Sequence, residues 1–215
     1  MEELNLPVRV VRPREDAEPS PLPGERPASY AVRAASAKAA SLLPLLTGPE
    51  AHDFMHVVPD GRGSSCSAPE TLPSNAVIIA ADTVVALNGR ILGKPENHEE
   101  ALQFLRLLSG TTHEVITGCA LESTGLHRHF FCRSLVSMWA CPDALLAAYA
   151  AGGEPMDKAG AYAVQGQGAM LVESIHGSWS NVVGLPLAET IQALLEVGAI
   201  VPELPPPFVD QGTMD

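Results

Sequence analysis

The stretch IIAADTVVALNGRILGKP, residues 78–95, joins an apolar run, an acid, a turn and a lysine. The apolar run predicts a buried strand with Asp82 at its end. Asn88-Gly89, between VVAL and RIL, is a strong signal for a two-residue β-hairpin. Lys94 then stands between a glycine and a proline. The stretch therefore raises the question of whether the acid and the cation serve one ligand.

Upstream of this stretch, residues 28–46 are rich in Ala and Leu. Apolar side chains such as Tyr30 and Leu42 recur there at helical spacing, so the run predicts a helix capped by Ser29 or started by Pro27. The acidic, proline-rich segment before it is expected to be an exposed loop.

The other elements are predicted from hydrophobic periodicity and from turn residues. Strands are expected over residues 7–11, 76–81, 113–124, 127–140 and 169–177, and helices over residues 97–110, 142–153 and 185–198. Residues 47–75 lack periodicity and are expected to form a long loop insertion, and residues 202–215 a flexible tail. We therefore expect one α/β domain over residues 1–201, in which helices flank a mixed twisted sheet.

Composition limits the classes of partner. The 215 residues are 46% hydrophobic and 18% charged, which allows a substantial core. A net charge of −12 argues against a nucleic-acid polymer, and an acidic enzyme acting on small anions would have to gather its cations locally and recruit a metal ion. No signal peptide and no apolar run of roughly 20 residues is present. We therefore expect a cytoplasmic protein without a membrane partner.

Asp82 and Lys94 are the first candidates for chemistry. A carboxylate beside a strand end can bind a divalent cation or accept a proton from water, and Thr83 adds a hydroxyl next to it. Asp82 could instead cap a turn. Lys94, held in GKP, suits a phosphate as a point charge, although lysines are also common in ordinary surface turns.

Two later segments could also meet a ligand. GEPMDKAGAYAVQGQGAML, residues 153–171, sets Gln165 and the pair Asp157-Lys158 among glycines, which suggests backbone brought close to a ligand or simply a flexible loop. Ser180, in SNVVGLPL, precedes a helix start that could bind an anion, but helix capping is the alternative.

Other candidates for chemistry are less specific. His127 and His129 alternate on a predicted strand, a spacing compatible with a metal site but also with exposed histidines. The four cysteines lack zinc spacing, and the P-loop, G-x-G-x-x-G and G-x-S-x-G motifs are absent.

Three segments together resemble the Maf family of nucleoside triphosphate pyrophosphatases. They are ADTVVALNGRILGKP, EEALQFLRLLSGTTHEVITGCAL and GEPMDKAGAYAVQGQGAMLVESIHGSWSNVVGLPL. The resemblance runs from about residue 7 to residue 197. It implies an elongated α/β body with a cleft between two lobes, often assembled as a homodimer. It also implies hydrolysis of a nucleoside triphosphate to the monophosphate and pyrophosphate with Mg²⁺ or Mn²⁺.

The resemblance also implies roles for single residues. Asp82 matches the aspartate usually assigned as proton acceptor, and it would also hold the metal. Lys94 matches the lysine of the family's GKP, and Lys38, in ASAKAA, matches the lysine of the helix after the acidic loop. Gln165 matches the glutamine of the late glycine-rich loop. Glu18 is the best match to the loop's acidic metal ligand, in a segment one residue longer than usual.

Thr83 and Gln165 imply a substrate preference. One branch of the family has Thr after the catalytic Asp and Gln in the late loop, and it prefers dTTP and UTP. A branch that prefers 7-methyl-GTP replaces both residues. The resemblance therefore implies pyrimidine triphosphates, including modified ones, as substrates of this chain.

The start of the sequence departs from the family pattern, in which a strand and an S-x-S-P-R-R segment precede LNLPVRVV. Here Met1 opens directly on MEELNLPVRVV. If these residues were the whole protein, we would expect weak turnover, because two phosphate-binding arginines would be missing. A nucleotide-binding regulator of septum formation with little catalysis is then the alternative. A hydrolase of inosine triphosphate is a further one.

Overall fold

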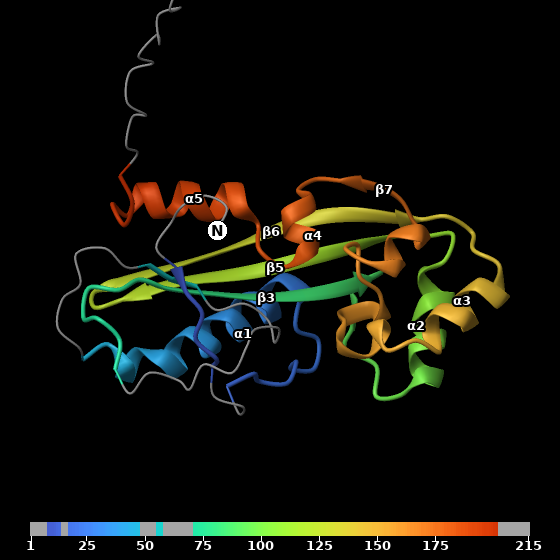
Figure 1. Cartoon of the computed structure of the whole chain (residues 1–215), viewed down its shortest axis with the longest axis horizontal. Helices are drawn as coiled ribbons and strands as arrows, with labels where there is room; N and C mark the ends of the chain where they lie inside the picture. Colours follow the sequence, from blue (N-terminus) through green and yellow to red (C-terminus); the bar gives the residue numbers. More distant parts are fainter. Residues whose placement is uncertain (1–7, 14–16, 48–54, 58–70, 202–215) are drawn as a thin grey trace, which may run out of the picture.

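In the computed structural model, residues 8–13, 17–47, 55–57 and 71–201 are described. They form a long twisted sheet with helices on both faces and at one end (Figure 1). The strands are β1 (Val8–Arg9), β2 (Met55–Val57), β3 (Ile78–Leu87), β4 (Arg90–Leu92), β5 (Thr112–Ser123), β6 (Leu126–Met138) and β7 (Val172–His176). The α-helices are α1 (Pro27–Leu42), α2 (His98–Leu108), α3 (Asp143–Ala150), α4 (Trp179–Val183) and α5 (Leu187–Glu196). The 3₁₀ turns are η2 (Leu43–Leu45), η3 (Glu154–Asp157), η4 (Ala159–Ala161) and η5 (Gln167–Leu171).

The sheet is mixed, as predicted. Its strand order is β1-β2-β3-β5-β6-β7, with β4 also paired to β3. The pairs β1-β2 and β2-β3 are parallel and the other pairs are antiparallel. The predicted α/β class is therefore confirmed.

Strand β3 is longer than predicted and does not end at Asp82. It runs from Ile78 to Leu87, and Asp82 pairs with Gly118 of β5 in its middle. The prediction was wrong because β5 pairs with β3 on both sides of the acid, a contact between distant segments that local pattern does not reveal. The predicted hairpin is confirmed. Asn88 and Gly89 have φ of 52° and 81°, the left-handed conformations that a type I′ turn requires.

One edge of β3 is left open in its middle. β5 pairs with residues 78–86 along the other edge. On the open side, β2 pairs only with Ile78 and Ile79, and β4 pairs only with residues 85–87. Between these two pairings, residues 80–84 have no strand partner on this side within the described ranges. Asp82 and its neighbours Ala81, Thr83 and Val84 line a cavity at this gap.

The helices α1 and α5 cover opposite faces of the sheet (Figure 1). An alanine face of α1 packs on Ala80 and Ala120, and α1 comes so close to β5 that a Cβ on Gly118 would lie 2.2 Å from the carbonyl carbon of Ala31. On the other face, Leu194 of α5 packs with Ile79. The small side chains under α1 thus set the distance between this helix and β3.

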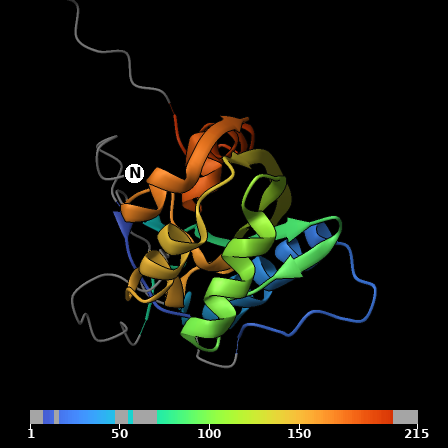
Figure 2. The same ribbon diagram turned by 90° about the vertical axis from the view of Figure 1, so that its right-hand side faces the viewer.

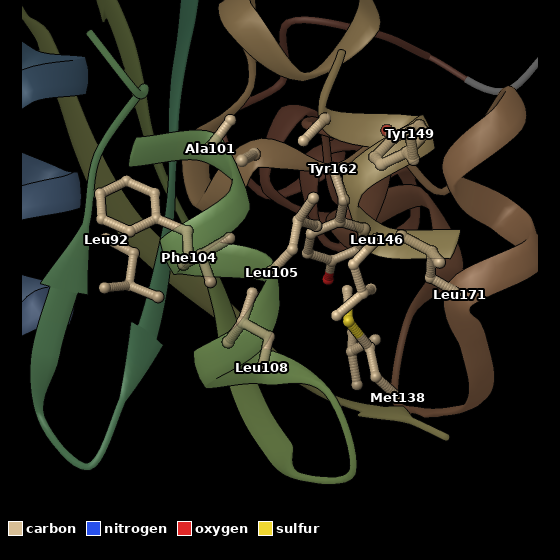
Figure 3. Packing of buried hydrophobic residues seen from close by; sticks show 14 of the residues in the cluster. Leu92, Ala101, Phe104, Leu105, Leu108, Met138, Leu146, Tyr149, Tyr162 and Leu171 are labelled. Atoms are coloured by element: carbon tan, nitrogen blue, oxygen red, sulfur yellow. The ribbon is translucent and has the colours of Figure 1, made fainter. Parts of the chain in front are cut away.

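The end of the molecule that carries α2 and α3, which faces the viewer in Figure 2, has its own hydrophobic cluster (Figure 3). Phe104, Leu105 and Leu108 of α2 pack there against Leu146 of α3 and against Tyr162. The sheet therefore joins two packing regions, one under α1, with α5 in a separate cluster on the opposite face, and one around α2 and α3.

The remaining differences from the predicted elements are local. The α1 helix begins at Pro27 without a cap from Ser29 and gives way at Leu43 to a 3₁₀ turn, because Pro44 cannot donate a helical hydrogen bond. Residues 55–57 form β2, so part of the predicted loop 47–75 is a strand. The rest of that loop between residues 48 and 70, and the predicted tail, lie outside the described residues.

Candidate active site

A cavity of about 570 Å³ opens at the unpaired edge of β3. It lies where the two packing regions meet, because its lining includes Tyr30 and Val84 from one and Leu92 and Tyr162 from the other. Its charged lining residues are Glu18, Lys38, Asp82, Lys94, Asp157 and Lys158. Five of the six predicted site residues line this cavity, namely Glu18, Lys38, Asp82, Thr83 and Lys94.

Asp82 and Lys38 form a buried ion pair beside the open edge. Asp82 points from β3 toward α1, where the Lys38 ammonium contacts its Oδ1. The same Nζ lies 3.1 Å from Oε2 of Glu18, so the amine sits between two carboxylates. The Asp82 side chain is 7% exposed and that of Glu18 is 44% exposed. The site thus places one carboxylate in the interior and one at the cavity surface.

Burial changes the proton affinities of the pair. Burial raises the pKa of Asp82 above its usual value, although the positive charges of Lys38 and Lys94 act against this. Burial tends to lower the pKa of Lys38, but the charge of Asp82 and the hydrogen bond to it overcome that effect, so this pKa is raised. Asp82 is therefore a stronger proton acceptor than a solvated aspartate, and Lys38 remains a cation at neutral pH.

Thr83 points to the opposite face of β3 from Asp82. Its Oγ1 lies 2.8 Å from Oγ1 of Thr117 and donates at 3.5 Å to the carbonyl oxygen of Gly184. Thr117 in turn donates to the carbonyl oxygen of Asn181 at 3.0 Å. These hydroxyls hold the end of α4 against β3. Both Asp82 and Thr83 reach the cavity because it surrounds the open edge.

Lys94 and Lys158 lie on two loops that a backbone hydrogen bond joins. The Gly160 N–H donates to the carbonyl oxygen of Gly93 at 3.0 Å. Gly160 has a φ of 68°, and a Cβ there would lie 2.8 Å from Val85, so this contact requires glycine. Lys158 pairs with Asp157 at 2.8 Å. Lys158, which is paired with Asp157, is thus a third lysine in the cavity lining, with Lys38 and Lys94.

Gln165 is the predicted site residue that does not line the cavity. Its side chain is exposed, whereas its neighbour Val164 lines the cavity. Residues 163–168 therefore contribute to the cavity lining through Val164. Sequence patterns did not single out Tyr30, Tyr162 or Val164, because an apolar lining residue looks the same in a sequence as a core residue.

The serines around the segment SNVVGLPL cap helices. Ser178 accepts from the N–H of Asn181 at 3.2 Å, and Ser180 accepts from the N–H of Leu187 at 3.0 Å. Asn181 is buried and donates to the carbonyl oxygen of Val115 and to Oγ of Ser134. These bonds explain the polar run without a ligand.

The two strand histidines both contact one glutamate. His127 and His129 lie 2.5 Å from the two carboxylate oxygens of Glu122, and none of the three lines the cavity. In the part of the chain that the structure describes, no group of three His, Cys, Asp or Glu has the arrangement to hold a metal ion.

Glu18 and Asp82 nevertheless fit a divalent cation, because a cationic amine already lies between them. Mg²⁺ is often held by one or two carboxylates, with waters and substrate phosphates completing its ligands.

Comparison with known proteins gives the family. Residues 1–197 match the Maf family, described as Maf-like protein, and the chain belongs to this family. The chain is 46% identical to the dTTP/UTP pyrophosphatase of Nitratidesulfovibrio vulgaris, over 95% of this chain and 84% of that protein. It is 43% identical to the dTTP/UTP pyrophosphatase of Oleidesulfovibrio alaskensis, over 86% of this chain and 74% of that protein. It is 39% identical to the dTTP/UTP pyrophosphatase of Anaeromyxobacter dehalogenans, over 89% of this chain and 84% of that protein. The family inferred from the sequence motifs is thus confirmed.

No helix in the described ranges is long and apolar enough to cross a membrane.

Proposed function

We propose that the protein hydrolyses dTTP, UTP and modified pyrimidine triphosphates to the monophosphate and pyrophosphate. The observation that carries this proposal is the set of cations around a buried carboxylate in one cavity. Lys38, Lys94 and Lys158 all line it with Asp82. The names of the relatives from Nitratidesulfovibrio vulgaris and Oleidesulfovibrio alaskensis, both dTTP/UTP pyrophosphatase, support the same activity.

Asp82 takes the role of proton acceptor for the attacking water. Its burial raises its pKa, which improves proton transfer from water near neutral pH. Water attacks the α-phosphorus, and the bond from that phosphorus to the bridging oxygen of the leaving pyrophosphate breaks. The proton from water passes to the Asp82 carboxylate. Asp82 contacts Lys38 and shares the cavity with Lys94 and Lys158, so positioning and charge do most of the catalytic work.

The lysines neutralise the phosphate oxygens. Lys94 faces the cavity from the GKP loop, and Lys158 faces it from the loop bonded to it. Lys38 exchanges part of its contact with Glu18 for phosphate oxygens. Glu18 and Asp82 would hold a divalent cation, Mg²⁺ or Mn²⁺, which when bound supplies further charge neutralisation and activates water.

The apolar part of the cavity takes the nucleobase. Val182, Leu185 and Val164 line it, and the Thr83 hydroxyl lies at its border. We assign the preference for uracil and thymine to Thr83 and to Gln165. A pocket with a few polar groups on an apolar wall is the usual form of a small-molecule site.

A substrate panel tests the proposed function. Pyrophosphate release would be measured with UTP, dTTP, CTP, ITP and 7-methyl-GTP, each with Mg²⁺, with Mn²⁺ and with a chelator. We expect metal-dependent release that is fastest with UTP and dTTP. Preference for ITP or 7-methyl-GTP would contradict the assigned specificity. Binding of UTP by calorimetry without any release would contradict the hydrolase and support a nucleotide-binding regulator.

A further inference from the structure

The glycine-rich loop over residues 163–168 folds around one carboxylate. Glu154 lies in η3, before the loop in the chain. Its Oε2 accepts from the backbone N–H of Gln167 at 3.0 Å, and its Oε1 accepts from that of Gly168 at 2.9 Å. Two consecutive backbone donors therefore converge on a single side chain.

Tyr149 of α3 holds the other end of the same loop. Its hydroxyl donates to Oε1 of Glu154 at 2.9 Å and accepts from the N–H of Ala163 at 3.3 Å. Tyr149 is only 3% exposed, and burial together with the bond to Glu154 raises its pKa, so the hydroxyl remains a donor. The pair Glu154-Tyr149 thus bonds the loop at its first residue and at its last two.

The close packing of the loop leaves no room for a side chain at Gly166 or Gly168. A Cβ on Gly166 would lie 2.5 Å from Oε2 of Glu154, and a Cβ on Gly168 would lie 2.6 Å from the Tyr149 hydroxyl. Burial tends to raise the pKa of Glu154, but the N–H groups of Gly168 and Gln167 overcome this and lower it. The bonds are therefore charge-assisted at neutral pH, which makes them stronger than neutral ones.

The fixed loop faces the cavity, but its holders do not. Val164 lines the cavity, Gln165 follows it, and neither Glu154 nor Tyr149 is a lining residue. We propose that Glu154, assisted by Tyr149, is a positioning residue that fixes Val164 in the cavity wall and Gln165 beside it, and thereby sets the preference among nucleobases. This inference rests on the proposed function, and it assigns base selection to a carboxylate outside the cavity.

The test is a double-mutant cycle on substrate preference. We would measure kcat and KM for UTP and for CTP in the wild type, in Glu154→Gln, in Gln165→Ala and in the double variant. Because Glu154 acts through the loop, we expect Glu154→Gln to raise the KM for UTP about tenfold, with kcat within about twofold and a smaller preference for UTP over CTP. The double variant should be no more than about twofold worse than Gln165→Ala. Tyr149→Phe should act in the same direction with a smaller effect.

Glu114→Gln is the matched control. Glu114 is a partly buried carboxylate that pairs with Arg133 at 2.8 Å and does not line the cavity, so its kinetics should equal those of the wild type. The inference is overturned if Glu154→Gln lowers kcat with unchanged KM and preference, or if the effects of Glu154→Gln and Gln165→Ala simply multiply. Absence of pyrophosphate release by the wild type would contradict the proposed function alone. In that case calorimetric affinities for UTP and CTP in the same four proteins decide the positioning role.

Discussion

At the scale of single residues, the pairing of Asp82 with Lys38 is the feature on which the site depends. The carboxylate is nearly buried, and the amine is its charge partner. Local pattern identified Asp82 as unusual but did not reveal that partner, because Lys38 lies on a helix far away in the sequence. Only the family resemblance named Lys38. The same holds for Glu154, whose partners are backbone N–H groups that carry no sequence signature.

Replacing Lys38 by methionine should destabilise the protein in a pH-dependent way. The change leaves Asp82 buried without its cation, and we expect a loss of about 2–3 kcal/mol at pH 8. Asp82 without Lys38 has a pKa raised further above the unfolded value, so the loss should be present at high pH and shrink as the pH falls and the carboxyl is protonated. Urea unfolding of the wild type and of Lys38→Met at pH 8 and pH 5.5 measures this loss in the free energy of unfolding. Arg133→Met, which removes an exposed pair, should change stability by less than about 1 kcal/mol. A loss that is equal at both pH values would contradict the explanation.

His113 should make the protein less stable in acid. It is 1% exposed, its Nε2 lies 2.7 Å from the Tyr162 hydroxyl, and burial lowers its pKa from 6.5 to about 4. Below pH 6.5 the unfolded chain takes up a proton that the folded chain does not, so stability should fall between pH 6.5 and pH 4, by up to roughly 3 kcal/mol. Urea unfolding across this range should show a steeper loss for the wild type than for His113→Gln. Equal slopes would rule out this histidine as the cause.

At the scale of elements, the position of α1 on the sheet determines where Lys38 lies. The turn at Asn88-Gly89 was readable in the sequence, since these two residues act on their own neighbours. The full length of β3 and the existence of β2 could not be predicted from the sequence, because both depend on pairing with distant strands. The close approach of α1 to Gly118 likewise appears only in three dimensions.

Gly118→Ala tests this close approach. The new methyl group would overlap the backbone of α1 near Ala31, and backbone cannot move aside as a flexible side chain can. We expect a loss of about 2–4 kcal/mol in stability and lower activity, since α1 carries Lys38. Thermal unfolding measures the stability. Gly153→Ala, where a Cβ meets nothing within 4 Å, should change it by no more than about 0.5 kcal/mol in either direction. Equal melting temperatures for Gly118→Ala and the wild type would contradict the packing described.

At the scale of the whole molecule, the cavity lies between two packing regions that the sheet joins. An acidic chain, with a net charge of −12, gathers three lysines around this cavity. A bound nucleotide would contact both regions at once, through Tyr30 on one side and Tyr162 on the other. The sequence patterns predicted the mixed α/β architecture, and the family resemblance predicted most of the residues that line the cavity. Neither revealed the gap between β2 and β4 at which the cavity opens.

UTP should therefore stabilise the protein against heat. At a concentration of about 100 times Kd, a ligand that binds only the folded state adds about 2.7 kcal/mol. We expect a rise of several degrees in the melting temperature with UTP and a chelator, which prevents hydrolysis of a metal-dependent enzyme. Uridine, which lacks phosphates, should give a much smaller rise. Equal rises with both would show that the lysines do not bind the triphosphate.

The central claim is that Asp82, at the open edge of β3, is the catalytic group of this cavity. The most direct test compares the rate of pyrophosphate release from UTP by Asp82→Asn with that by the wild type, once with Mg²⁺ and once with Mn²⁺. The amide keeps the shape of the side chain but neither accepts the proton nor carries the charge. We predict a loss of at least about 10²-fold with either metal, with the fold retained. Activity of Asp82→Asn within about twofold of the wild type would contradict the account.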